Sequence, residues 1–353
     1  MTITTELIEP SSSLWTEILA GTAHDFYHLP CYQQLSAQPE DRPRGFVATA
    51  GEHRVLVPFL QRPIPADLCG EEGLFDTASP YGYPGPLISE GAPGEFIREA
   101  FKAFENKLSE ERVIAGFFRL HTLLNQPSDF EGVGEIVGHG PSVFIDLTLS
   151  EEELWKQTRR GHKRDLVVLQ ERGYEITMDD WDRLDDFLTC YYDSMRRLHA
   201  APFYFFPKSY FEQLRNCVGS DRIHLCLVRA GEEIACAGLV TEMDGLCQYH
   251  LSATADPHFQ DHPSKLMLHH LRGWLKARGN RIFHIGGGVG ALRDTLHLFK
   301  SGFSPNSSDF YTWRIVSDPV RYCRALDHWA KAAGRPPVDK ESFFPQYRAP
   351  LQP

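Results

Sequence analysis

The chain has 353 residues, of which 42% are hydrophobic and 24% are charged, so it is long enough for two globular domains of roughly 150 to 200 residues each. Its formal net charge of -11 argues against a protein that grips DNA over a broad basic face, although it is compatible with a local basic patch. Apolar runs such as VLVPFL are far shorter than the ~20 residues that cross a bilayer, and the N-terminal residues lack a leader pattern, so we expect a cytoplasmic protein without a membrane span.

Two segments predict the same β-hairpin, one in each half of the chain. Residues 47–60 read VATAGEHRVLVPFL and residues 227–240 read LVRAGEEIACAGLV, so an Ala-Gly-Glu turn joins two apolar runs in both. Each hairpin is followed by a helix-like segment, GEFIREAFKAFENKL or PSKLMLHHLRGWLKARG, and then by a strand-like run, VIAGFFRL or RIFHIGG. We therefore expect an internal duplication of the order strand, strand, helix, strand.

The boundary between the two halves is expected near residue 150. A strand-like run ends at Leu147, and Ser150 with Glu153 three residues later has the pattern of a capping box at the start of a helix. The sequence thus predicts one domain over residues 1–149 and a second over residues 150–353.

A basic segment follows this boundary, with five cations and no acid between Lys156 and Arg164. One explanation is that these cations complement the dipole at the C-terminal end of the helix that begins at Ser150. The other is a phosphate-binding patch. Because five cations exceed what a helix end requires, we favour the patch.

Residues 249–303 carry the pattern that points most directly to chemistry. YHLSAT ends one strand-like run, FHIGGG ends the next, and LHLFKSGF follows as a helix-like segment. Glycines at a strand end expose backbone groups, and the helix would deliver the cation Lys300 to them. The familiar hydrolase, nucleotide-binding and dehydrogenase motifs are missing from the sequence, and its histidines and cysteines have no ligand spacing, so we expect no metal centre.

These motifs together resemble the Fem-type aminoacyltransferase family. YHLSAT at residues 249–254, GGG at 286–288 and LFKSGF at 298–303 carry the resemblance, and DTASPYGYPGP at 76–86 adds to it in the first half. The resemblance spans most of the chain. It implies an α+β fold of two tandem GNAT-like domains, each with a mixed central sheet flanked by helices. It also implies transfer of an amino acid from aminoacyl-tRNA to an amine.

The resemblance assigns the donor side of the site to the second half. Lys300 would contact the donor terminus and the charge that develops on it, and Phe299 would shape the same pocket. His250 is the nearby group suited to proton transfer near neutral pH. The other residues expected to bind the donor are Gly286, Gly287, Gly288, Tyr249, Arg160, Lys163 and Arg164. On the acceptor side, the candidates are Tyr81, Tyr83 and Asp76.

One departure from the commoner acetyltransferase pattern bears on the cofactor. CoA-dependent enzymes of this fold hold the pyrophosphate on a glycine-rich loop at a helix N-terminus. Here that position reads HFQDHPSKLM at residues 258–267, without glycine and with Asp261, which would repel a phosphate. We therefore expect aminoacyl-tRNA as co-substrate with no bound cofactor, acyl-CoA being less favoured, and a small molecule or peptide as the amine acceptor. Two alternatives remain: an N-acyltransferase that depends on CoA or a carrier protein, and a non-catalytic binding protein with the same fold.

Overall fold

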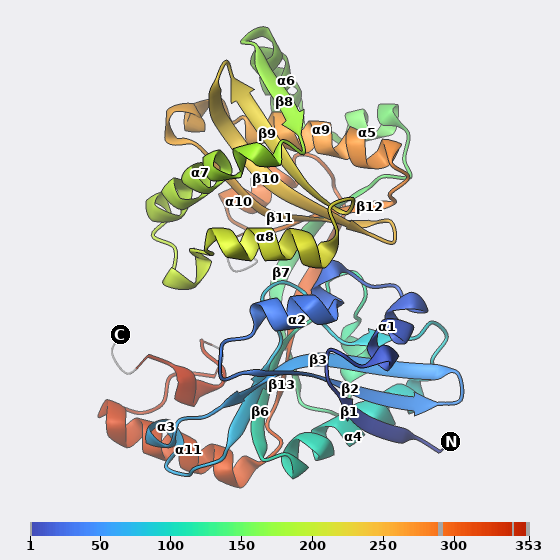
Figure 1. Cartoon of the computed structure of the whole chain (residues 1–353), viewed down its shortest axis with the longest axis vertical. Coiled ribbons are helices and arrows are strands. Elements are labelled where there is room, and N and C mark those ends of the chain that lie inside the picture. The colour runs from blue at the N-terminus through green and yellow to red at the C-terminus, as the bar shows by residue number, and fades with distance from the viewer. Residues whose placement is uncertain (1, 289–291, 341, 351–353) are drawn as a thin grey trace. The chain divides into compact units, whose positions relative to one another are not determined.

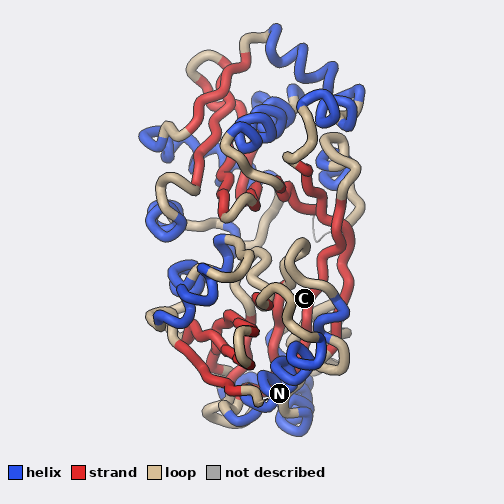
Figure 2. Tube along the Cα trace, turned by 90° about the vertical axis from the view of Figure 1, so that its right-hand side faces the viewer, coloured by secondary structure: helices blue, strands red, loops and turns tan. Residues whose placement is uncertain are grey.

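The computed structural model describes residues 2–288, 292–340 and 342–350. It divides into two compact units, residues 1–139 with 310–353 and residues 140–309. In each unit a mixed β-sheet lies between helices (Figure 1, Figure 2). This is the α+β architecture that the sequence predicts. Within the described ranges no helix is both long enough and apolar enough to span a membrane.

The first unit is built on a sheet with the strand order β1-β2-β3-β4-β6-β13, in which β5 pairs with β3. The strands are β1 (Thr4–Ile8), β2 (Arg42–Ala50), β3 (His53–Pro63), β4 (Phe75–Ala78), β5 (Leu87–Ile88), β6 (Val113–Arg119) and β13 (Ser307–Ile315). The helices are α1 (Ser13–Ala20), α2 (Pro30–Ser36), α3 (Ala66–Cys69), α4 (Gly94–Glu110) and α11 (Pro319–Ala333). β4 and β6 run parallel, and the other neighbours along this order are antiparallel.

Alternation along β2 explains why helices cover both faces of this sheet. Phe46 and Ala48 pack into the core that α4 covers, whereas Val47, which points the other way, packs with Trp15 of α1. α11 closes a further core around Ile114 of β6.

The second unit has the strand order β7-β12-β11-β10-β9-β8. The strands are β7 (Glu135–Asp146), β8 (Tyr174–Met178), β9 (Ile223–Ala230), β10 (Glu233–Met243), β11 (Leu246–Thr254) and β12 (Ile282–Gly287). The helices are α5 (Glu151–Gln157), α6 (Arg160–Glu171), α7 (Leu184–Arg197), α8 (Lys208–Val218), α9 (Ser264–Ala277) and α10 (Thr295–Lys300). The main core lies between the sheet and the helices α6 and α9, which cover one face of the sheet. α7 and α8 cover the opposite face (Figure 1).

The predicted duplication is confirmed. The hairpins β2–β3 and β9–β10 turn at Gly51 and Gly231, which have positive φ angles of 61° and 63°. A third antiparallel strand follows each hairpin, then α4 or α9, and then a strand parallel to that third strand, β6 or β12.

The structure divides the chain differently from the predicted domains 1–149 and 150–353. β7 pairs with β12, so residues 140–149 belong to the second unit. β13 pairs with β6, and α11 follows it, so residues 310–353 return to the first unit. The predicted boundary missed this because the last strand of each sheet comes from outside the repeated segment, and pairing between strands far apart in the sequence leaves no local signal.

Candidate functional site

The parallel strands β11 and β12 pair only at their beginnings. Their register joins Leu246 to Ile282, Cys247 to Phe283 and Gln248 to His284. Just beyond the last pair, each strand has a β-bulge. In β11 the bulge is against β10 and His250 is the extra residue, and in β12 the bulge is against β7 and Ile285 is the extra residue. Such β-bulges bend strands. The two strands therefore continue past Gln248 and His284 without a described pairing between them.

Lys300, the residue predicted to be central, lies at the end of β12. It is the last residue of α10, only 8% exposed, and its Nζ donates a hydrogen bond to the carbonyl oxygen of Gly287 at 2.9 Å. Burial lowers the pKa of Lys300 to about 8, and the nearby Asp294 carboxylate opposes that shift. The structure thus brings the lysine and the glycines together, as the motifs predict.

The glycines make room for this approach. Gly286 has a φ of 79°, and a Cβ there would lie 3.1 Å from the Lys300 Nζ. A Cβ on Gly288 would lie 2.2 Å from Asp294 Oδ1, the atom that caps α10 by accepting from the His297 amide. Close packing of α10 against the strand end therefore explains Gly286 and Gly288. Whether their amides also bind a donor stays a prediction.

The basic segment docks directly onto the helix that carries Lys300. The Arg159 backbone amide donates to the Gly302 carbonyl at 2.7 Å, and its guanidinium donates to the Leu298 carbonyl at 3.1 Å. His162 Nε2 lies 2.8 Å from the carbonyl oxygen of Phe299. Phe299 itself is half-buried against the main core. Arg159 and His162 thus fix the first turn of α6 beside α10. Arg159 belongs to the predicted basic patch, but neither residue was predicted to hold this turn.

The helix dipole explains only Lys156, which lies in the last turn of α5, and not the cations that follow it. The expected single helix breaks at Thr158, whose hydroxyl bonds back to the Leu154 carbonyl and is held by Arg272. Arg160, Lys163 and Arg164 therefore lie in the first turns of α6, where the dipole disfavours positive charge. Arg160 and Arg164 are exposed, whereas the Lys163 ammonium lies 5.1 Å from the centre of the Trp155 ring. Cations at a helix N-terminus favour an anionic ligand.

Tyr249 and His250 do not share one environment. Tyr249 packs against the main core beside Phe283, and burial raises the pKa of its hydroxyl well above the ordinary value. His250 lies 3.4 Å from the hydroxyl of Tyr210 in α8, and burial lowers the pKa of His250 to about 3. An imidazole with this pKa stays neutral around pH 7, so the expected proton transfer near neutral pH does not fit His250.

A chain of buried polar side chains links the neighbouring strands β7, β12 and β11 at the point where β11 and β12 separate. His284 Nε2 lies 2.6 Å from Ser142 Oγ of β7, and His284 Nδ1 lies 2.7 Å from Gln248 Oε1 of β11. All three side chains are buried. Sequence reasoning missed this chain because Ser142 and His284 are 142 residues apart and are joined only by strand order. The one local signal was a histidine two residues before the glycine motif.

The acceptor candidates lie in the first unit and differ from one another. Asp76 is fully buried, with its carboxylate 2.8 Å from Arg62 and 2.6 Å from Arg348. The Tyr347 hydroxyl also donates to it at 3.2 Å. Asp76 is therefore an internal ion-pair group, and its prediction as an acceptor-binding residue is wrong. The sequence could not reveal this because Arg348 is 272 residues away.

Tyr81 and Tyr83 are half-buried in a loop that hydrogen bonds hold in place. The Tyr32 hydroxyl donates to the Tyr81 carbonyl at 2.9 Å, and Asn125 Nδ2 donates to the Pro86 carbonyl at 2.7 Å. The Tyr83 ring packs edge-on against Phe310, with 5.4 Å between ring centres. The loop is thus a rigid turn, and the binding of an acceptor by its two tyrosines stays a prediction.

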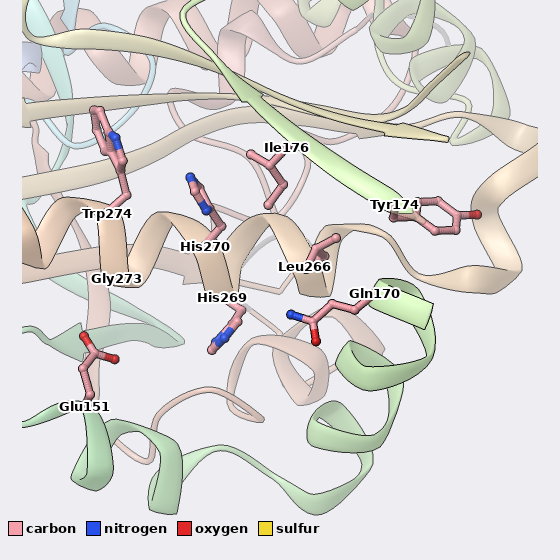
Figure 3. A pocket seen from close by; sticks show the side chains of 9 residues that line it. All are labelled: Glu151, Gln170, Tyr174, Ile176, Leu266, His269, His270, Gly273 and Trp274. Atoms are coloured by element: carbon pink, nitrogen blue, oxygen red, sulfur yellow. The ribbon is translucent and has the colours of Figure 1, made fainter. Parts of the chain in front are cut away.

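A separate hollow of about 590 Å³ opens beside α9. Its walls come from α5, α6, β8 and α9, and the lining residues are Glu151, Gln170, Tyr174, Ile176, Leu266, His269, His270, Gly273 and Trp274. His270 projects from α9 on the side of Ile176, and His269 projects on the opposite side (Figure 3). The hollow contains none of the predicted site residues. Among the described residues, no group of histidines, cysteines and carboxylates has the arrangement of a metal site.

Comparison with known proteins places this geometry in a known fold. Residues 156–301 match the family model of an acetyltransferase (GNAT) domain. The crystal structure of FemX matches with a TM-score of 0.67 at 10% identity, over 91% of this chain and 100% of that chain. L-PGS from Bacillus licheniformis matches with a TM-score of 0.56 at 13% identity, over 91% of this chain and 96% of that chain.

A tandem GNAT protein from the clavulanic acid biosynthesis pathway also matches, with a TM-score of 0.51 at 11% identity, over 90% of this chain and 99% of that chain. No curated protein sequence matches the chain. These solved structures share the fold of this chain at low sequence identity. The chain therefore has a tandem GNAT-like fold, as the sequence predicts, and its residues 156–301 match the model of an acetyltransferase (GNAT) domain.

Proposed function

We propose that this chain is an acyltransferase that forms an amide, moving an aminoacyl group from aminoacyl-tRNA to the amine of a small molecule or peptide. The observation that carries the proposal is the buried ammonium of Lys300, held 2.9 Å from the Gly287 carbonyl where β11 and β12 separate. Burying a charge is costly. A perturbed cation beside a strand end is therefore a candidate for chemistry rather than for stability.

The aminoacyl ester is already activated, so the reaction requires neither ATP nor a metal. The acceptor nitrogen attacks the ester carbonyl carbon, a tetrahedral intermediate forms, and the ester oxygen leaves with a proton. Lys300 uses one of its three N–H donors on Gly287, which leaves two for the oxyanion. With its pKa lowered to about 8, Lys300 is mostly charged at pH 7 and performs this task as an ammonium.

The start of α6 supports a polyanionic donor. Arg160 and Arg164 are exposed in its first turns, and Arg159 and His162 attach those turns to α10. A phosphate backbone on this surface would place its 3′ end near Lys300. Phosphate contacts make such binding strongly dependent on salt.

Binding is tested by gel shift with charged and uncharged tRNA over a range of salt concentrations. The double variant Arg160→Gln, Arg164→Gln should bind more weakly and should reduce the salt slope by about 1 for each contact removed. Arg196→Gln, an exposed cation of α7, is the matched control and should leave the slope unchanged. Absence of tRNA affinity at low salt would refute the proposed donor.

Catalysis is tested by amide formation with a panel of aminoacyl-tRNAs. Lys300→Ala should abolish transfer while tRNA binding remains, and Lys102→Ala, an exposed lysine of α4, should have no effect. Unchanged transfer by Lys300→Ala would disprove the assignment of the site. If the wild type binds charged tRNA without forming an amide, the chain is a binding protein with this fold.

A second candidate, N-acyl transfer from acyl-CoA or a carrier protein, is favoured by the match to an acetyltransferase domain. The segment before α9 argues against it. Asp261 stands there in place of a glycine-rich loop, held by Arg172 and, at 2.7 Å, by the hydroxyl of Tyr174. Saturable amide formation from acyl-CoA in the absence of tRNA would establish this second function.

A further inference from the structure

The Ser142, His284 and Gln248 side chains have the serial order of hydroxyl, imidazole and orienting group. The distances of 2.6 Å and 2.7 Å are both within the range of hydrogen bonds. A hydroxyl next to an imidazole that a third group orients is an arrangement with which proteins move protons. None of the three residues has a role in the transfer described above.

From these contacts we infer which nitrogen of His284 carries a proton. Gln248 Oε1 can only accept, so the 2.7 Å contact places the proton on Nδ1. Nε2 is then the unprotonated nitrogen, and it accepts a hydrogen bond from the Ser142 hydroxyl. In this tautomer the imidazole is ready to take a proton that arrives through Ser142.

The polar chain lies at the point where the two parallel strands separate. Gln248 and His284 form the last pair between β11 and β12, and Ser142 is the strand partner of Gly287, whose carbonyl binds Lys300. The chain therefore adjoins the site already described.

The polar chain and the lysine approach this strand end from opposite faces of the sheet. Val143, Cys247 and Phe283 point into the main core, so the adjacent Ser142, Gln248 and His284 point to the other face. Lys300 Nζ lies 3.1 Å from the Cβ position of Gly286, and Gly286 is the strand partner of Val143 on the core face. A cation and an unprotonated base thus flank the same end of β12.

We propose that Ser142, His284 and Gln248 form a proton relay that removes the proton of the attacking acceptor amine. This inference rests on the proposed amide-forming function. As the N–C bond forms, the amine proton passes to Ser142 Oγ while the Ser142 proton passes to His284 Nε2. The imidazolium returns a proton along the same path to the ester oxygen when the C–O bond breaks, so the relay regains its starting state. His284 and Gln248 act through Ser142 and are positioning residues.

The relay has a signature in the pH profile of amide formation. The rate should rise with pH as His284 loses its proton, which gives an acid limb. Other titratable groups on the neighbouring elements include Tyr249 and His250 on β11, Tyr210 on α8 and Lys300 on α10. A variant that acts on His284 alone is therefore required.

Gln248→Glu supplies that variant, because it keeps the size of the side chain and places a carboxylate against Nδ1. An opposite charge within ~4–6 Å favours the charged form, so the acid limb should move to higher pH by about 1 unit or more. Ser142→Ala should lower the rate by ~100-fold, in line with the contribution of general acid–base groups. Ser142→Thr should restore most of the rate. Thr241→Val, which removes a fully buried hydroxyl of β10, is the matched control and should leave the profile unchanged.

The outcomes separate the relay from the proposed function. If the wild type forms amide but the acid limb is the same in Gln248→Glu, the relay is refuted and the function stands. If the wild type forms no amide from charged tRNA or from acyl-CoA, the function is refuted and the relay with it. Nitrogen NMR of the histidines provides a readout that does not depend on activity: a proton on His284 Nε2 in the resting protein would overturn the relay.

Discussion

Replacing Lys300 with methionine should stabilise the protein and abolish transfer. Methionine retains the length and apolar packing of the lysine stem without its charge. The pKa of Lys300 falls from 10.5 to about 8 on folding, a cost of roughly 3 kcal/mol at about 1.4 kcal/mol per pH unit. The full cost applies below pH 8, where the folded and unfolded states both carry the proton. It disappears as pH rises from about 8 to 10.5, because the folded state loses its proton first.

The measurement is urea unfolding followed by circular dichroism at pH 7 and at pH 10. Lys300→Met should unfold at higher urea than the wild type at pH 7, and the difference should shrink to about a quarter at pH 10. Lys102→Met, whose side chain is 58% exposed in the wild type, should show no difference at either pH. A Lys300→Met variant that is equally stable or less stable at pH 7 would mean that its surroundings stabilise the ammonium, and the reasoning would be wrong.

Three further predictions concern other buried groups. Burial lowers the pKa of His224, but its two carboxylate partners raise it more, to about 8. The protonated His224 therefore contributes ~2 kcal/mol of stability below pH 6.5, and this contribution is lost as pH rises through 8. In urea, His224→Gln should be destabilised at pH 6 more than at pH 9, and a difference that does not vary with pH would contradict this. Gly286→Ala should lower transfer at least ~10-fold because it strains the backbone and crowds Lys300, whereas Gly279→Ala, with φ 86° and open space, should lose only stability. Asp76→Ala should lower the free energy of unfolding by ~1–3 kcal/mol, measured in urea, because it leaves two half-buried arginines without their carboxylate partner.

Those features that a short stretch of chain determines could be predicted from the sequence. The two hairpins turn at Gly51 and Gly231 because a tight turn needs a positive φ, which glycine adopts at little cost. Lys300 meets Gly287 because only 13 residues separate them and α10 begins at a good N-cap, Asp294. Both features leave a local pattern, which is why the duplication and the contact of Lys300 with the glycine segment could be predicted.

The remaining features depend on contacts between residues far apart in the sequence. Ser142, His284 and Gln248 meet only because β7, β12 and β11 are neighbours in the sheet. The break between α5 and α6 depends on Arg272, which holds Thr158 from 114 residues away. Burial, strand order and partners of this kind leave no periodicity in the sequence. The burial of Asp76 and the meeting of Ser142, His284 and Gln248 could therefore not be predicted.

The glycine of the LFKSGF motif has a consequence for protein engineering. A Cβ on Gly302 would lie 2.3 Å from Nε2 of His162, so the turn after α10 and the first turn of α6 are shaped to each other. In a chimera that takes residues 295–303 from a relative, the turn after α10 would pack against a first turn of α6 to which it is not fitted. Residues 159–164 and 295–303 should therefore be transplanted together in any such chimera, so that the two turns keep their fit to each other.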